Sequence, residues 1–324
     1  MKTNILSYSH QLSDGLLTAG RGATARAYTA AVKRLLNFVG NTKLRFEELS
    51  TRVLKDFEQY LLSEGKHRNT ISAYMRMLRS ISNQAIKDLG ISLPSDLFDY
   101  VFTGMDPADK RAVSPQLLSK IAVLDLSNDP SLAFARDLFL LSFYLRGIPF
   151  VDLCYLRKSD VNRGTLRYRR SKTRRLLVVE IESCAQEIID RYLPLTTGAS
   201  FLLPIILKKD VDDYDQYQSA LRNHNKKLHR LSALLHLRVP LTSYVPRHSW
   251  ATAAYHKGIP VSFISAAMGH ASEKITHHYL ASFDNNTMRD VNRQVISLIA
   301  PQSSEPSAKY SKGQRGRKGI QGYR

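Results

Sequence analysis

Near its C-terminus the chain reads Tyr244-Val-Pro-Arg-His-Ser-Trp-Ala-Thr252, and the pair Gly269-His270 follows, with Tyr279 nine positions beyond it. An arginine can grip two phosphate oxygens at once through its planar fork, and a histidine can donate or accept a proton near neutral pH. A tyrosine oxygen can act as a nucleophile and hold a covalent intermediate. Because its ordinary pKa is about 10, it needs cationic neighbours to react at neutral pH. The pattern therefore suits attack by a phenol oxygen on a phosphodiester.

The composition indicates a polyanionic partner. The 324 residues include 47 Lys and Arg against 28 Asp and Glu, which gives a net charge of +19. A charge of this size points first to nucleic acid. A ribosomal protein or a protein bound to an anionic membrane would share the charge, but neither explains the phosphate-directed residues. Two cysteines, Cys154 and Cys184, are too few for a disulfide framework and indicate a reducing cytosol.

The length suits two domains, and the first is predicted to be helical over residues 23–89. One helix ends at Gly40, a second begins at a Ser50 cap and ends before Gly65, and a third begins after Asn69. Prolines and glycines interrupt the helical period from about residue 90 to 112, where we expect a linker. No apolar run is long enough to span a membrane, and the first residues lack the apolar core of a signal peptide.

The second domain mixes helices with one predicted strand pair. Helices begin at Ser114-Pro115 and at Asp129-Pro130, and the second of these ends near Arg146-Gly147. The strands are Thr165–Arg169 and Leu176–Ile181, with Lys172 in the turn between them. Further helices are predicted at residues 182–192, 213–235, 245–257, 261–268, 272–281 and 287–299. Residues 301–324 have no apolar pattern and should form a disordered basic tail.

Two further groups of basic residues are candidate DNA contacts. The third helix and the loop before it carry Lys66, Arg68, Arg76 and Arg79. The region of the strand pair contributes Arg169, Arg170 and Arg174. Such charges commonly do no more than solvate a surface, but their single sign favours contact with phosphates.

Taken singly, each residue of the main motifs also has a structural interpretation. Arg146 ends an apolar helix, where a buried charge is unfavourable, so it either pairs with a carboxylate such as Asp152 or clamps a phosphate. His248 can be a satisfied buried histidine, and His270 can be a helix cap. Tyr279 is one of 16 tyrosines, so composition alone favours a packing role.

The combination is more specific than its parts. The order Arg146, Lys172, Arg247-His248, Gly269-His270, Tyr279 resembles the tyrosine recombinase (phage integrase) family. The motifs that carry the resemblance are Tyr144-Leu-Arg-Gly147, Ser171-Lys-Thr-Arg174, Arg247-His-Ser-Trp-Ala-Thr252, Gly269-His270 and Thr276-His-His-Tyr-Leu280. The resemblance is close over residues 112–299, and the helical N-terminal region looks like the core-binding domain of that family.

The resemblance implies a mainly α fold with a small antiparallel β-sheet. A SAM-like core-binding domain with its linker would span residues 1–105, a catalytic domain residues 106–300 and a basic tail residues 301–324. The two domains would form a C-shaped clamp on double-stranded DNA. A chain that is monomeric in solution would assemble into a homotetramer on synapsed recombination sites and exchange strands through a Holliday junction. Its location would be the cytoplasm, in association with the nucleoid.

The resemblance also implies roles for individual residues, without a metal, ATP or other cofactor. Tyr279 would attack the scissile phosphate and form a 3′-phosphotyrosyl link. Arg146, Arg247 and His270 would neutralise the phosphate oxygens. Lys172 would protonate the leaving 5′-oxygen, and His248 would assist proton movement or position the phosphate.

Two positions depart from the family pattern. Tyr244 stands where many members have histidine, and a phenol can donate a hydrogen bond but cannot replace an imidazole. The acidic residue that follows the first arginine is displaced along the chain, to Asp152, by an apparent short insertion. We expect it either to orient basic partners or to be structural.

Several alternatives share part of this pattern. A type IB topoisomerase uses the same chemistry, but the N-terminal helices look more like a recombinase module. A non-catalytic DNA-binding regulator would not require the ordered motifs, and a structural basic protein would leave the tyrosine inert. A metal nuclease would need a carboxylate or His-Glu spacing that the histidines lack.

The short stretch before residue 23 favours a simple Xer-like or inversion enzyme over a mobile-element integrase, which stays an alternative. The amphipathic segment 287–299 would pack on its own domain or on a neighbouring protomer.

Overall fold

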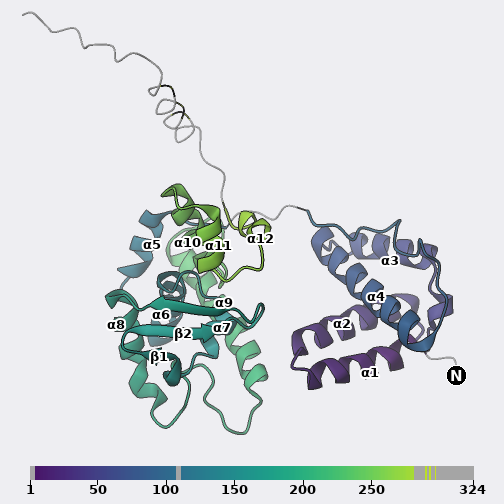
Figure 1. Ribbon diagram of the computed structural model, residues 1–324, viewed down its shortest axis with the longest axis horizontal. Helices are drawn as coiled ribbons and strands as arrows, with labels where there is room; N and C mark the ends of the chain where they lie inside the picture. The colour runs from purple at the N-terminus through teal and green to yellow at the C-terminus, as the bar shows by residue number, and fades with distance from the viewer. Residues whose placement is uncertain (1–3, 107–110, 281–288, 290–291, 293–295, 297–324) are drawn as a thin grey trace, which may run out of the picture. The chain divides into compact units, whose positions relative to one another are not determined.

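The computed structural model describes residues 4–106 and 111–280, together with residues 289, 292 and 296. The chain divides into two compact units, Met1–Asp109 and Lys110–Arg324 (Figure 1). The predicted helix 287–299, apart from those three residues, and the predicted tail 301–324 lie outside the described residues. None of the helices that the structure describes is long and apolar enough to cross a membrane.

The first unit is a helical domain, as predicted. It contains α1 (Ile5–Thr18), α2 (Gly22–Val39), α3 (Thr51–Ser63) and α4 (Arg68–Leu89), with a 3₁₀ turn at Phe46–Glu48. Gly40 ends α2 in the left-handed conformation with φ of 70°, and the Ser50 side chain caps α3 by accepting a hydrogen bond from Val53 N. These local signals therefore explain why the predicted helices begin and end where they do.

The helix α1 was not predicted. Its buried face includes the small polar residues Ser9 and Ser13, so the apolar periodicity is weak. Both hydroxyls are satisfied by backbone carbonyls, those of Leu6 and Ala25, which makes their burial acceptable.

The stretch after α4 is non-helical, but part of it belongs to the first unit. Leu97, Phe98 and Val101 are buried in the same core as the apolar faces of the helices. The proline and glycine signals therefore marked the end of helical structure correctly, while the apolar side chains between them pack like core residues.

The second unit is also mainly helical. Its helices are α5 (Pro115–Ala122), α6 (Pro130–Tyr144), α7 (Phe150–Cys154), α8 (Ser183–Tyr192), α9 (Asp213–Leu234), α10 (Val245–His256), α11 (Val261–Ala267) and α12 (Glu273–His277), with 3₁₀ turns at Lys158–Asp160 and Leu193–Thr196. Ser114 and Asp129 cap α5 and α6, each with a proline in the first turn, as the sequence indicated. The short α7 was not predicted, and α12 is shorter than the predicted 272–281.

A three-stranded antiparallel sheet completes the second unit, in the order β1 (Val161–Asn162), β2 (Thr165–Arg169), β3 (Leu176–Glu180). The predicted pair is present, with Leu166 opposite Val179 and Arg169 opposite Leu176. The two-residue β1 is too short to give a periodic signal. It joins β2 through Arg163-Gly164, both with positive φ, which is the backbone of a tight hairpin turn.

Two buried polar side chains lie in the core of this unit. Asp137 on α6 is only 1% exposed and accepts hydrogen bonds from Arg136 Nε (2.8 Å), Arg191 Nη1 (2.6 Å) and the Tyr192 hydroxyl (2.8 Å). His224 on α9 stacks on Phe150 with ring centroids 4.5 Å apart. Burial lowers the pKa of His224 to about 3, so it is neutral at physiological pH.

Candidate active site

Arg247 lies at the centre of the site, in the first turn of α10. Its side chain is 2% exposed, and two segments, at Gly147 and at Met268–His270, fix its guanidinium. Nη1 donates to the Gly147 carbonyl (2.6 Å), while Nη2 donates to the Met268 carbonyl (2.7 Å) and lies 2.8 Å from His270 Nε2. Burial, and secondly the charge of Arg170, lower the pKa of Arg247 to about 10, so it keeps its charge at neutral pH.

The chain turns sharply at Arg146-Gly147 to reach Arg247. Both residues have the left-handed backbone conformation, with φ of 58° and 70°, directly after α6 ends. A Cβ on Gly147 would lie 2.8 Å from Arg247 Cα, so only glycine permits this close approach. The half-buried Arg146 side chain is directed towards the sheet, where Nη1 lies 3.3 Å from the Val178 carbonyl.

His270 is fixed from both sides of its ring. Its side chain is buried, and Nδ1 lies 2.8 Å from Thr276 Oγ1. Because a guanidinium can only donate, Nε2 accepts from Arg247, and Nδ1 therefore carries the ring proton. Burial, and then the charges of Arg247 and other basic residues, lower the pKa of His270 to about 3. The free protein consequently holds a neutral imidazole here.

Tyr279 follows α12 and lies among these groups. Its ring centroid is 4.7 Å from that of His248 and 5.0 Å from that of His270, and the Arg247 guanidinium carbon is 5.4 Å from it. Its carbonyl accepts from Thr252 Oγ1 (3.1 Å), which fastens this segment to α10. Composition could not distinguish this tyrosine from the other fifteen, whereas its surroundings of two imidazoles and an arginine do.

The remaining motif residues surround this cluster. Lys172 is exposed on the β2–β3 hairpin, and its charge contributes to the lowered pKa of His270. His248 is half-buried, and burial lowers its pKa. Tyr244 precedes α10 and is 53% exposed. Burial of its hydroxyl, followed by the nearby Tyr279, raises the pKa of Tyr244, so it is a neutral phenol at physiological pH.

Of the two roles expected for Asp152, its contacts favour the structural one. It is 4% exposed, and its Oδ1 accepts a hydrogen bond from the backbone N of Ser171 (2.9 Å). No ion pair joins it to Arg146 among the residues that the structure describes. Asp152 therefore holds the main chain of the hairpin beside Lys172.

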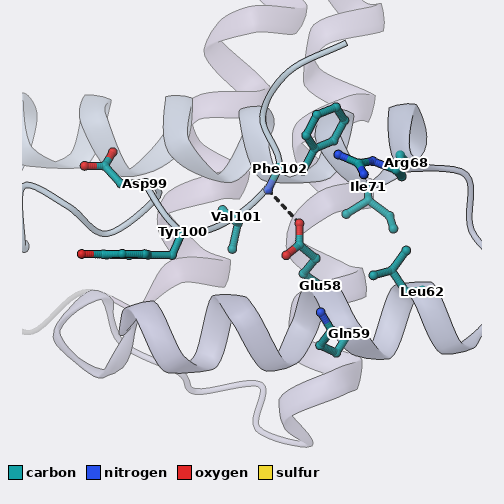
Figure 2. Close-up of a pocket in the computed structure, with 9 residues that line it drawn as sticks. All are labelled: Glu58, Gln59, Leu62, Arg68, Ile71, Asp99, Tyr100, Val101 and Phe102. Atoms are coloured by element: carbon teal, nitrogen blue, oxygen red, sulfur yellow. Dashed lines mark hydrogen bonds between the residues drawn. The ribbon is translucent and has the colours of Figure 1, made fainter. Parts of the chain in front are cut away.

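The candidate DNA contacts fall into two classes. Most are exposed: Lys66, Arg76, Arg79, Arg169 and Arg174. Of these, Arg169 donates through Nη1 to the Arg174 carbonyl (3.2 Å). Arg68 is already engaged within the first unit, because it pairs with Asp106 (3.2 Å) and its guanidinium carbon lies 4.2 Å from the Phe102 ring centroid. Figure 2 shows this contact, together with the hydrogen bond from Phe102 N to Glu58.

Arg170 corrects the expectation of an exposed DNA contact. It is only 6% exposed and donates to the Met268 carbonyl, which also accepts from Arg247. Sequence reasoning placed it with its exposed neighbours because the basic run gives no indication of which arginines point inwards. Arg175, which binds the His270 carbonyl, was missed for the same reason. Thr276, which binds the His270 ring, was missed because nothing in the sequence around a single threonine indicates such a contact.

Comparison with known proteins agrees with this geometry. Residues 4–95 match the phage integrase SAM-like domain, and residues 122–286 match the phage integrase family. The tyrosine recombinase XerA of Pyrococcus horikoshii is 24% identical over 270 residues, which cover 73% of this chain and 91% of that protein.

Solved structures share the fold at low sequence identity. A lambda integrase dimer bound to a COC′ core site has a TM-score of 0.61 at 16% identity, over 86% of this chain and 79% of that one. A lambda integrase tetramer bound to a Holliday junction has a TM-score of 0.60 at 16% identity, over 84% and 78%. The catalytic-domain match alone covers more than half of the sequence, and the protein is therefore a member of the phage integrase family.

Proposed function

We propose that this protein is a site-specific DNA recombinase that cuts and rejoins strands through a covalent link to Tyr279. The observation that carries the proposal is the position of the Tyr279 ring between His248 and His270, beside the Arg247 guanidinium. A phenol surrounded by a fixed cation and two imidazoles is suited to attack an anionic phosphate.

In the proposed step, Tyr279 Oη attacks the scissile phosphorus. The new P–O bond forms as the P–O5′ bond breaks, which leaves a 3′-phosphotyrosyl link. His248 takes the phenol proton, and Lys172 gives a proton to the departing 5′-oxygen. Attack by the 5′-hydroxyl of another strand reverses each transfer. The phosphodiester energy stays in the protein–DNA bond, so the reaction needs no external energy source.

Arg146 and Arg247 neutralise the phosphate oxygens in this scheme. Losing one such preorganised donor typically raises a reaction barrier by about 2.7–4 kcal/mol. His270 becomes a donor only if its Nε2 gains a proton, because Nδ1 already donates to Thr276. An anion beside the ring raises the pKa of a histidine. We therefore expect DNA binding to promote this protonation and to turn the imidazole towards the phosphate.

We further propose that the substrate is double-stranded DNA at specific sites and that four protomers act on two synapsed duplexes. The net charge of +19, the family match and the fold shared with a lambda integrase tetramer on a Holliday junction support this. Integration, excision and inversion use one chemistry, so each is an outcome open to this site. Action on DNA would place the protein in the cytoplasm at the nucleoid.

A nicked suicide substrate tests the proposal, because loss of a short strand fragment traps the covalent intermediate. Libraries of such duplexes made from the chromosomal DNA of the host should yield a phosphotyrosyl adduct with the wild-type protein. Tyr279→Phe should abolish the adduct and keep DNA affinity. Tyr100→Phe, which removes an exposed hydroxyl from the first unit, is the matched control. An adduct that survives Tyr279→Phe excludes this nucleophile, and DNA binding without any adduct favours a non-catalytic regulator.

A further inference from the structure

The β2–β3 hairpin holds the segment that carries His270 through four consecutive carbonyl groups. Arg170 donates to the carbonyl of Met268, and Thr173 Oγ1 donates to that of Gly269 (3.0 Å). Arg175 donates through Nη1 to the carbonyl of His270 and lies through Nη2 3.4 Å from that of Ala271. These three side chains, which we call the hairpin clamp, thus bind every carbonyl from position 268 to position 271.

The electrostatics of this arrangement are favourable. Met268 ends α11, and the last carbonyls of a helix carry partial negative charge and lack intrahelical partners. Arginines are well suited to this position because one guanidinium can reach two carbonyls. Arg170 is nearly buried, whereas Arg167, three positions earlier on the outer side of β2 and next to Tyr168, is exposed. The hairpin therefore directs one arginine inwards and leaves another in solvent.

The contact is also close-packed. Gly269 has a φ of 64°, and a Cβ there would lie 3.1 Å from Leu177 Cδ1 and 3.2 Å from Arg170 Cδ. Real Cβ atoms seldom come this near to other atoms, so the hairpin and the turn before His270 meet without room for a larger residue. The two segments therefore behave as one rigid piece.

We infer that Arg170, Thr173 and Arg175 are positioning residues that set Lys172 and His270 at a defined separation. Lys172 lies between Arg170 and Thr173 in the chain, and His270 lies inside the clamped segment. The inference rests on the proposed function, because there Lys172 protonates the departing 5′-oxygen and His270 donates to the same phosphate. It assigns Arg170 and Arg175, which bind carbonyls of the His270 segment, to active-site geometry, while the exposed Arg167 remains available for the DNA backbone.

The two roles predict different measurements. An arginine that binds a phosphate contributes to DNA affinity. Its removal weakens binding and reduces the slope of log affinity against log salt concentration by about one. A positioning residue leaves affinity unchanged and slows the chemical step, since a misplacement of about 1 Å can reduce a rate by about a hundredfold. Two measurements therefore separate the two roles: the cleavage rate at saturating suicide substrate, and the DNA affinity as a function of salt concentration.

The test compares Arg175→Gln, Arg170→Gln and Thr173→Val with Arg167→Gln in the full chain. We expect the three clamp variants to cleave about tenfold to a hundredfold more slowly at saturating DNA, with dissociation constants and salt slopes like those of the wild type. Arg167→Gln should cleave at the wild-type rate. Arg175→Lys, which keeps one donor, should recover part of the lost rate. Thermal unfolding identifies any variant that fails to fold. If the buried Arg170 does not tolerate replacement, the exposed Arg175 and the half-buried Thr173 still provide the test.

Hydrogen exchange of the free protein tests the clamp independently of DNA cleavage. Peptides that cover residues 168–176 and 265–272 should exchange faster in Arg175→Gln than in the wild type, and Arg167→Gln should not change them. If all clamp variants cleave at the wild-type rate and show unchanged exchange, the inference is overturned, while the proposed function is not affected. Weakened, less salt-dependent binding with an unchanged rate at saturation would do the same. If the wild type forms no phosphotyrosyl adduct, the proposed function fails, and the exchange result still decides whether the clamp exists.

Discussion

Replacing Gly147 by alanine tests the closest backbone approach in the site. The added Cβ would lie 2.8 Å from Arg247 Cα and 3.2 Å from its Cβ and Cγ, in a residue with φ of 70°. A side chain in the left-handed region costs about 1–2 kcal/mol, and overpacking of a dense core costs about 1–3 kcal/mol more. We therefore expect Gly147→Ala to lower the free energy of unfolding by about 2–5 kcal/mol.

Gly258→Ala provides the matched control in the same unit. Gly258 follows α10 with φ of 79° and has nothing within 4 Å of an added Cβ, so only the conformational cost of about 1–2 kcal/mol remains. The single tryptophan, Trp250, lies on α10, so its fluorescence in urea reports the second unit alone.

Activity should separate the two glycine variants further. Displacing the Gly147 carbonyl removes an acceptor 2.6 Å from Arg247 Nη1. Suicide-substrate cleavage should therefore fall at least about tenfold in Gly147→Ala and stay unchanged in Gly258→Ala. Equal unfolding free energies for the two variants, with full activity in both, would refute the argument that this approach requires glycine.

Three other perturbations have defined outcomes. Asp137→Ala leaves Arg136 and Tyr192 without their buried acceptor, and we expect it to lower the free energy of unfolding of the second unit by about 3 kcal/mol, measured in urea. A loss below about 1 kcal/mol would show that this network does not stabilise the fold. Thr276→Val leaves His270 Nδ1–H unpaired and should cost about 1–3 kcal/mol and slow cleavage, whereas Thr276→Ser should restore both; equal behaviour of the two variants would contradict this role. The pKa of His224 is lowered from 6.5 to about 3 in the folded state, so the unfolded chain binds the proton more readily and stability falls as pH drops below about 6.5. From pH 7 to pH 5 the wild type should lose about 2 kcal/mol more than His224→Leu, measured by Trp250 fluorescence in urea, and parallel losses would exclude this histidine as the cause.

Sequence reasoning succeeded where a local signal carries the structure. The Ser50, Ser114 and Asp129 caps begin helices as predicted, and the alternation in Thr165–Arg169 forms a strand. It failed where the signal is weak or short. The helix α1 buries serines instead of a full apolar stripe, and β1 has only two residues. A period of 3.6 or 2 cannot be detected in such segments.

The candidate site shows the same division. The resemblance to the family indicated Arg146, Arg247, His270 and Tyr279 as a group, and the structure brings the last three side by side. The resemblance could not indicate that Arg170 is buried while its neighbour Arg169 is exposed, because both stand in one basic run. Inward or outward direction depends on the pleat of β2 and on the carbonyls that the second unit brings to it.

The linear order of residues alone thus determined the helical character, the hairpin, the excess of positive charge and the set of reactive side chains. Only the folded chain decided which of them meet. Gly147, Met268 and His270 are far apart from Arg247 in the chain, yet all three bind its guanidinium. The physical reason is that a buried cation must find acceptors to offset its lost hydration, and those acceptors come from whichever loops the packing of the core brings within hydrogen-bonding distance.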